Sequence, residues 1–429
     1  MTESAASAKE DAVLNGSAMV PDLCRDEFCW RRSIAVGLCV YLATLIPVVL
    51  GVVAGFELLK PGRPIPYGED SLLLRFAAWD GGQFMSIMEG GYQYDPARMS
   101  NIVLFPGYPL IARMVQWITG LSAAASLLIV SHFCLLAAMI IYHRLMQFRF
   151  GNDRVADICV ATLAAFPTTF FWRMAYSESP FVLLQVLFLY GIQRKWSWEN
   201  LAIVVGLASS LRLVGIAMLV PLAMEFVQQR KAGGNRIDVA TFGRLSVCSI
   251  LGVSGLLCFM LFQWIRFGDP FVFVRGQAAF CLRQPVSGVE HLYRLVTLEP
   301  IRGTYLSSSD CFWQRHSPVP GPWLNLQFWN PIWFCLTCGL VFYAWFHRQL
   351  TDAESALGAG LLLISYAGRA EEFCMGSQAR YASVVIPAAM VLGFQLTRCS
   401  WMFHVGLAVV SISLMTLYSA MFGAWYFFL

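Results

Sequence analysis

Long apolar segments separated by short polar ones run along most of the chain. The first begins near residue 34 and ends near residue 58, which exceeds the roughly 18 to 20 apolar residues needed to cross a bilayer. Similar segments follow at residues 124–146, 155–171, 178–193, 200–212, 213–228, 244–266, 330–347, 355–367, 381–396 and 402–427. This pattern predicts an all-α, polytopic membrane protein with about eleven transmembrane helices.

The distribution of Lys and Arg predicts how these helices are oriented. Basic residues occur in the short segments WRRS, HRLMQFRFGNDR, IQRKW, QQRKAGGNR, FHRQ and LTRCS. If the helices alternate in direction, all of these lie on the side of the N-terminus, and short cytoplasmic loops carry an excess of Lys and Arg. We therefore expect residues 1–33 to be a cytoplasmic polar tail, and the first apolar segment to be a retained span rather than a cleaved signal sequence.

The opposite, external side then receives two long loops, at about residues 59–122 and 267–329, and the short connections FWRMAYSES and GRAEEFCMGSQARY. These segments hold most of the acidic and arginine residues that orientation does not explain. No repeat of fixed period is visible, so residues 34–429 are expected to form one transmembrane domain with two external insertions. A functional site is expected on this external side.

Composition excludes several function classes. The chain is 58% hydrophobic and 13% charged. Its net charge is +4 and its basic residues are scattered among short connections, so the sequence has no basic patch of the kind that binds nucleic acid. No glycine-rich nucleotide motif is present, and the six histidines are isolated. No D-x-D pair stands in the external loops to hold a metal on a nucleotide sugar. No cofactor and no metal site are therefore expected, and any sugar donor is expected to be linked to a lipid rather than to a nucleotide.

The 13 cysteines lie mostly inside predicted helices, where a buried thiol behaves as a small hydrophobic group. The one C-x-x-C pair, Cys335 and Cys338, lies within a predicted span and is a weak metal or redox signal. Cys281 and Cys311 share an external loop and are candidates for a disulfide.

The stretch Trp79-Asp80-Gly81-Gly82 lies in the first external loop. The two glycines allow a turn that presents Asp80 to an open space, although Asp beside Gly is also a common turn former or helix cap. Aromatic residues lie beside Asp80 and further along the same loop, and they are suited either to stacking on sugar rings or to an interfacial belt. They are Trp79, Tyr92, Tyr94 and Tyr108.

A second polar stretch, FPTTFFWRMAYSESPF, places Arg173, Tyr176 and Glu178 at the external end of one span and the start of the next. Charges this close to hydrocarbon are costly, so these residues either reach the interface or line a polar cavity. A plain ion pair between Arg173 and Glu178 is the alternative.

Two further arginines stand out. Arg212 is a lone cation among about 28 apolar residues, and an arginine in that position calls for an anionic partner such as a phosphate or carboxylate. Arg380 and Tyr381 lie where a helix begins, either as an anchor of the span or within reach of a lipid headgroup. Together with Arg173, these arginines place three cations on one side of one membrane, as a lipid-phosphate leaving group would require.

These stretches resemble, in the same order, the motifs of the PIG-V type mannosyltransferase family of the GT-C class of membrane glycosyltransferases. The resemblance rests on Trp79-Asp80-Gly81, GGYQY with LFPGYPL, FPTTFFWRMAYSESPF, SSLRLVG and GSQARYASVVIP. It implies inverting transfer of mannose from polyprenyl-phosphate mannose to a lipid-linked or glycan acceptor on the non-cytoplasmic face. It also implies that Asp80 is the catalytic base, and that the donor and acceptor pockets are lined at Arg173, Glu178, Arg212 and Arg380.

The chain departs from the family at Gln83, where members often carry His or Trp, which puts acceptor recognition in doubt. The chemistry agrees with the resemblance, because inverting transfer needs one carboxylate base and cations for the departing phosphate. A secondary transporter or lipid flippase is the main alternative, and a non-catalytic subunit on the same scaffold is another. The expected location is a bacterial inner membrane, with the endoplasmic reticulum as the alternative, and membrane lipids are expected partners.

Overall fold

The computed structural model describes residues 30–64, 71–232, 239–316 and 321–426. Within these ranges the chain is helical and contains no strand, which confirms the predicted all-α class. Residues 1–29 of the expected cytoplasmic tail lie outside the described ranges. The last residues of that tail instead begin the first described helix, since α2 starts at Trp30.

Every apolar segment predicted from the sequence coincides with a helix or with two consecutive helices. They are α2 (Trp30–Leu58), α6 (Ala123–Phe150), α7 (Asp153–Ala165) with η2 (Pro167–Arg173), α8 (Glu178–Gln193), α9 (Trp198–Leu211), η3 (Leu213–Met218) with α10 (Leu219–Ala232), α11 (Val239–Phe267), α15 (Leu326–Phe346), α16 (Asp352–Arg369), α17 (Gln378–Ser383) with α18 (Ile386–Leu396), and α19 (Trp401–Gly423).

The length and apolar composition of the helices support fewer membrane crossings than the sequence predicted. In the described part of the chain, 5 helices are long and apolar enough to cross a membrane, or up to 6 if the bent pair α7 and η2 forms one span. Several other helices are shorter, for example α8 with 16 residues and α9 with 14. The protein therefore has several membrane-spanning helices, and the number of about eleven stays a prediction.

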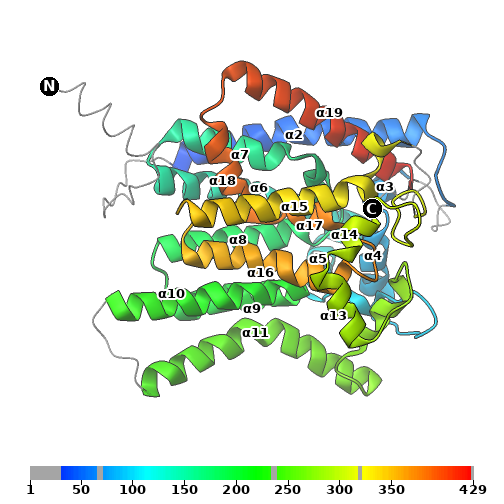
Figure 1. Ribbon diagram of the computed structural model, residues 1–429, viewed down its shortest axis with the longest axis horizontal. Coiled ribbons are helices and arrows are strands. Elements are labelled where there is room, and N and C mark those ends of the chain that lie inside the picture. The colour runs from blue at the N-terminus through cyan, green and yellow to red at the C-terminus, as the bar shows by residue number, and fades with distance from the viewer. Residues whose placement is uncertain (1–29, 65–70, 233–238, 317–320, 427–429) are drawn as a thin grey trace.

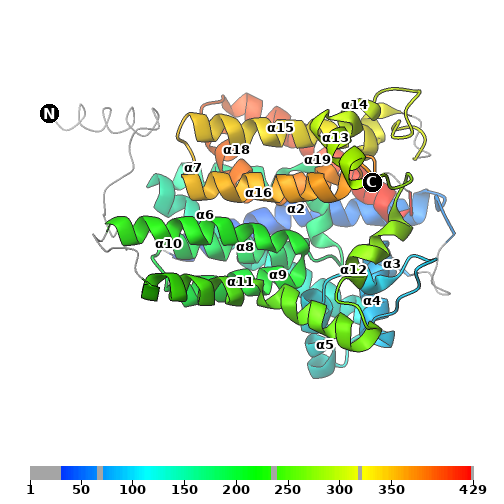
Figure 2. The ribbon, with the colours of Figure 1, turned by 60° about the horizontal axis from the view of Figure 1, so that its bottom comes forward.

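The long helices run side by side, and the short helices of the two external loops gather at one end of them (Figures 1 and 2). The first loop contains α3 (Leu72–Phe76), α4 (Asp80–Gly90), η1 (Asn101–Val103) and α5 (Gly107–Thr119). The second contains α12 (Val272–Arg275), η4 (Gly276–Phe280), α13 (Gly288–Val296), α14 (Glu299–Gly303) and η5 (Pro322–Leu324). Both loops thus lie at the same end of the bundle, as the predicted orientation requires.

Small residues bring the first and last described long helices together. A Cβ atom at Gly51 of α2 would lie 2.2 Å from the carbonyl oxygen of Thr416, and one at Gly55 would lie 2.1 Å from that of Ala420. Both contacts are shorter than any real Cβ contact, so only glycine fits. Gly51 and Gly55 form the small-xxx-small pattern that lets helix backbones approach closely in membranes.

Cys281 and Cys311, the candidate pair whose bonding the sequence left open, are not bonded to each other. Cys311 bonds to Cys374, in the segment between α16 and α17. Cys281 instead keeps a free thiol, which donates to Glu372 Oε2 at 3.4 Å. Burial, and next the negative charge of Glu372, raise the pKa of the Cys281 thiol to about 12. Cys281 is therefore a protonated thiol at neutral pH, and the disulfide joins the second loop to the segment before α17.

Candidate active site

Asp80 is the first residue of α4, and the residue before it has a strained backbone conformation that sets where the helix begins. The sequence had suggested that Gly81 and Gly82 make the turn, but the residue with a positive φ, of 61°, is Trp79. Gly81 matters for another reason, because a Cβ atom there would lie 3.3 Å from the Cβ atom of Ala175. The backbone N–H of Ala175 also donates to the carbonyl of Phe76 at 3.0 Å. The start of α4 therefore packs directly against the connection between η2 and α8.

This packing brings Asp80 onto two predicted site residues. Its backbone N–H donates to the hydroxyl of Tyr176 at 3.3 Å. Its carboxylate accepts a hydrogen bond from Nη1 of Arg380, with 2.8 Å between Nη1 and Oδ2. The Asp80 side chain is 37% exposed, whereas that of Arg380 is 8% exposed. Asp80 thus combines a fixed ion pair with access to a group approaching from outside.

Glu178 connects the same arginine to a second one. It is the first residue of α8, it is fully buried, and Oε1 accepts hydrogen bonds from both Arg380 and Arg212. Arg212 lies between α9 and η3 as a single extended residue, with φ −155° and ψ 143°. The result is a chain of alternating charges, Asp80, Arg380, Glu178 and Arg212, which we call the Asp80 cluster.

Aromatic rings cover the guanidinium groups of this cluster. The Arg380 guanidinium lies 4.4 Å from the ring centroid of Tyr176, and that of Arg212 lies 5.4 Å from the ring centroid of Tyr381. Such contacts favour a cation that is largely removed from water. They explain how Tyr176 and Tyr381, both expected to line the site, support the arginines.

The charges of the Asp80 cluster balance, with two carboxylates and two guanidinium groups. Buried charges are tolerated when they are paired in this way, and removing one partner leaves the other uncompensated. Glu178 Oε2 is buried and has no hydrogen-bond partner among the described residues. A buried carboxylate oxygen without a hydrogen-bond partner costs folding free energy, so packing alone does not account for a glutamate at this position.

Two predicted site residues lie outside the Asp80 cluster. Arg173 is fully buried and donates to Thr44 of α2 and to the carbonyl of Thr169 at 3.1 Å. The alternative ion pair between Arg173 and Glu178 is therefore not formed. Tyr108 is also buried, and its hydroxyl lies 2.7 Å from that of Ser131 and donates to the carbonyl of Leu127 at 2.9 Å. Both side chains are therefore part of the packed interior and lie outside the Asp80 cluster.

The remaining predicted residues flank Asp80 along α4. Trp79 lies against Trp425, with 5.4 Å between ring centroids, and under the guanidinium of Arg63 at 5.3 Å. Gln83 is half-buried one turn after Asp80. The sequence did not point to Trp425 or Arg63, because a Trp or an Arg just beyond the end of an apolar helix is typical of an interfacial anchor.

A separate cavity of about 590 Å³ lies within the second loop, and its lining contains no member of the Asp80 cluster. Nearby, His291, Glu371 and Glu372 bring possible metal-ligand atoms within 4.8 Å of one another, alone in this among the described residues. Glu371 Oε1, however, accepts from Arg283 and Arg294 at 2.9 Å each. Two guanidinium groups on one carboxylate oxygen oppose a cation there.

Comparison with known proteins supports the resemblance noted from the motifs, although no family model matches the chain. The chain is 29% identical over 217 residues to GPI alpha-1,6-mannosyltransferase 2 of Cricetulus griseus, which is 46% of this chain and 41% of that protein. It is 30% identical over 238 residues to the Mus musculus protein of the same name, which is 49% of this chain and 45% of that protein. The chain thus spans under half the length of the curated relatives it matches.

Among solved structures, the chain is similar to the Archaeoglobus fulgidus oligosaccharyltransferase tethered with an acceptor peptide, with a TM-score of 0.42 and 14% identity. It is similar also to the oligosaccharyltransferase AglB of that organism in complex with an inhibitory peptide and a dolichol-phosphate, with a TM-score of 0.39 and 14% identity. Each match covers 90% of this chain and 55% of the other.

Proposed function

We propose that the protein is a GT-C type membrane mannosyltransferase that moves mannose, with inversion, from polyprenyl-phosphate mannose to a lipid-linked or glycan acceptor. The similarity to GPI alpha-1,6-mannosyltransferase 2 supports the sugar and the reaction class. One observation carries the proposal within the structure: a partly exposed carboxylate, Asp80, is held by a largely buried chain of arginine, glutamate and arginine. A base and cations for a phosphate stand together there.

The reaction needs one base. The carboxylate of Asp80 takes the proton from an acceptor hydroxyl, and the hydroxyl oxygen bonds to the anomeric carbon of mannose on the face opposite the phosphate. The bond from that carbon to the phosphate oxygen breaks at the same time, and its electrons leave with the polyprenyl phosphate. No second carboxylate is required as a nucleophile, which agrees with the burial of Glu178 behind the arginines.

Arg212 is the stronger candidate for contact with the phosphate. It donates through Nη1 to Glu178 and, at 3.5 Å, to Ser177, and no described residue accepts from its other nitrogens. Its side chain is 13% exposed. A phosphate gains negative charge as it departs, and a guanidinium with free donors stabilises that charge.

Arg380 and Glu178 then act on the other groups of the cluster. Arg380 fixes the carboxylate of Asp80, and Glu178 holds Arg212 and Arg380 together. A carboxylate at this position could orient either the acceptor or an arginine, and the contacts of Glu178 favour the second role.

The proposed location of the site is the non-cytoplasmic face of the membrane. The Cys311–Cys374 disulfide joins the second loop to the segment that leads into α17, which carries Arg380. Disulfides persist in oxidising compartments and are rare in the cytosol. This pairing and the basic residues of the opposite connections both support the external side, in a bacterial inner membrane or in the endoplasmic reticulum.

The donor is tested with purified protein in detergent and native membrane lipids as acceptors. We expect label from synthetic polyprenyl-phosphate [³H]mannose to enter a new product, and label from GDP-[³H]mannose to stay unreacted. Product from GDP-mannose would contradict the donor class. Donor binding without any product, across acceptor fractions, would favour the transporter or the non-catalytic subunit. Opposite anomeric configurations in donor and product, measured by NMR, would establish inversion.

A further inference from the structure

The segment between α16 and α17 contains an unusual run of backbone conformations. Cys374, Met375 and Ser377 have φ values of 52°, 60° and 63°, and none of them is glycine. Residues with side chains rarely adopt this left-handed region, and they stay there only where the surroundings hold them. Something must therefore hold this segment, residues 370–377, in place.

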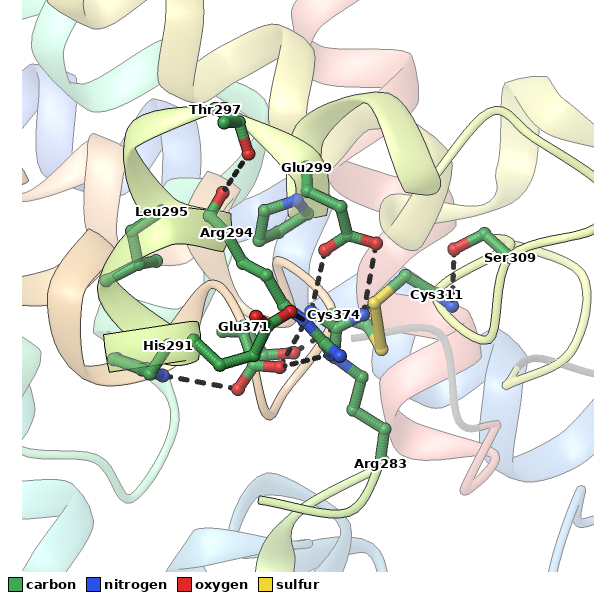
Figure 3. Close-up of polar contacts among 12 residues, drawn as sticks. Arg283, His291, Arg294, Leu295, Thr297, Glu299, Ser309, Cys311, Glu371 and Cys374 are labelled. Atoms are coloured by element: carbon green, nitrogen blue, oxygen red, sulfur yellow. Dashed lines mark hydrogen bonds and ion pairs between the residues drawn. A yellow bond between two sulfur atoms is a disulfide. The ribbon is translucent and has the colours of Figure 1, made fainter. Parts of the chain in front are cut away.

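Glu371 is the first point at which it is held. The side chain is fully buried, and Oε1 lies 2.9 Å from Arg283 Nη2 and 2.9 Å from Arg294 Nη1 (Figure 3). Oε2 lies 3.2 Å from Nδ1 of His291. All three partners belong to the second external loop, so one carboxylate gathers three side chains of that loop.

Backbone hydrogen bonds and a disulfide also hold residues 370–377 in place. The N–H groups of Leu282 and Arg283 donate to the carbonyl of Glu372, at 2.8 and 3.2 Å. The disulfide from Cys311 reaches Cys374, and the Cys374 carbonyl accepts from the side chain of Gln327 (Figure 3 shows the disulfide beside the Glu371 contacts). The second loop thus holds the segment before its left-handed run, at Glu371 and Glu372, and within it, at Cys374.

The segment continues directly into the helix that carries Arg380. Ser377, at φ 63°, is the N-cap residue of α17, and its carbonyl accepts from the N–H of Tyr381 at 3.0 Å. Helix α17 has only 6 residues. A helix this short has little rigidity of its own, so the path of the chain before it helps to set where its side chains point.

We propose that Glu371 is a positioning residue for Arg380. Held by Arg283 and Arg294 and supported by the Cys311–Cys374 disulfide, it fixes residues 370–377 so that the Arg380 guanidinium stays between Asp80 and Glu178. The second loop then controls the geometry of the base without contacting the reacting atoms. The effect on catalysis rests on the proposed function, whereas the effect on α17 does not.

The test compares Glu371→Gln with Glu290→Gln in the full-length protein. Glu290 is a matched control, because it also pairs with Arg294, at 2.9 Å, but is 46% exposed and lies at the surface of the same loop. The first readout is hydrogen exchange of the amides of α17. We expect their exchange in Glu371→Gln to be faster by on the order of tenfold, and unchanged in Glu290→Gln. Unchanged exchange in folded Glu371→Gln would overturn the proposal.

The second readout is the separation of kcat from KM in mannosyl transfer. We expect kcat of Glu371→Gln to fall by on the order of 10- to 100-fold with little change in donor KM, because misplacing a group that orients the base slows the chemical step. Glu371→Asp keeps the charge, and it should recover a large part of kcat. A fall in kcat without recovery in Glu371→Asp, or an equal fall in Glu290→Gln, would contradict the assignment.

If Glu371→Gln fails to fold, Arg294→Lys takes its place, since it keeps the positive charge and loses the forked geometry. The same exchange readout then decides, with faster exchange in α17 expected and unchanged exchange overturning the proposal. If the parent protein shows no transfer, the proposed function fails by itself, and the exchange measurement still tests the positioning of α17.

Discussion

Glu178 is the residue on which the Asp80 cluster depends most. It is fully buried and shares one oxygen between two guanidinium groups, so a neutral amide there would leave the buried Arg380 and the partly buried Arg212 with only Asp80 as counter-ion. We expect Glu178→Gln to destabilise the folded protein by about 3 kcal/mol, as for the loss of one partner of a buried ion pair, and to abolish transfer. Thermal unfolding in detergent measures the first effect.

Glu89→Gln is the control for this change, because Glu89 is an exposed residue of α4. It should unfold like the parent and keep its activity. A Glu178→Gln protein as stable and as active as the parent would show that the cluster does not need its central carboxylate.

Arg212 and Arg173 were both candidates in the sequence, and in the structure only Arg212 belongs to the Asp80 cluster. Arg212→Lys keeps the charge but loses the planar fork, so we expect donor KM to rise by about tenfold. Arg173→Lys should instead lower stability and leave the donor KM of the folded fraction unchanged, because Arg173 contacts Thr44 and Thr169 rather than the cluster. Equal effects of the two changes on donor KM would contradict the assignment of Arg212.

The sequence predicted the members of the Asp80 cluster better than it predicted their contacts. Asp80, Glu178, Arg212 and Arg380 were identifiable because ionisable groups beside apolar segments are costly and need a reason. Their partners depend on how four distant segments pack, which local patterns do not encode. Arg173 and Glu178 are close in sequence, and yet Glu178 pairs with arginines at positions 212 and 380.

The contact between α2 and α19 is the element most sensitive to a small change. A Cβ atom at Gly55 would overlap the carbonyl oxygen of Ala420, so we expect Gly55→Leu to lower stability by at least about 2 kcal/mol. Gly406→Leu, on α19 itself, is a matched control, because a Cβ atom there meets nothing within 4 Å. The midpoint of thermal unfolding in detergent compares the two, and equal midpoints would refute the close contact.

Among the helices, positions were predictable and interruptions less so. Apolar length located each segment, since burial in lipid demands it. The segment expected at residues 155–171 is in fact bent by 79° between α7 and η2. Pro167 follows the break, and proline disfavours a helical conformation of the preceding residue, here Phe166 with ψ 130°. That signal was present in the sequence but was masked by the continuous apolar run.

At the scale of the whole molecule, both external loops should face the non-cytoplasmic side. Glu290→Cys, in the second loop, should react with a membrane-impermeant maleimide in intact cells. Lys195→Cys, in the turn between α8 and α9, should react only after permeabilisation, because the two positions lie at opposite ends of the predicted spans. The parent protein, with its free cysteines, gives the background. Labelling of Lys195→Cys alone in intact cells would reverse the orientation.

The arrangement of the loops around the site was the part least accessible to sequence reasoning. The second loop carries no motif that points to α17, and its link to Cys374 joins residues 63 positions apart. The sequence suggested Cys281 as the partner of Cys311 because both lie in one loop. Disulfide pairing depends on which Cβ atoms approach in three dimensions, and spacing along the chain does not determine this.

Asp80 is proposed as the base of a mannosyl transfer, and a comparison of three initial rates tests this role. The initial rate of transfer from polyprenyl-phosphate mannose is measured for the parent, Asp80→Asn and Asp95→Asn. Asp95 is an exposed carboxylate of the same loop, paired only loosely with Arg98 at 3.8 Å. We predict that Asp80→Asn stays folded and loses transfer by at least about 100-fold, whereas Asp95→Asn matches the parent. A folded Asp80→Asn protein that turns over at the parent rate would show that Asp80 is not the base.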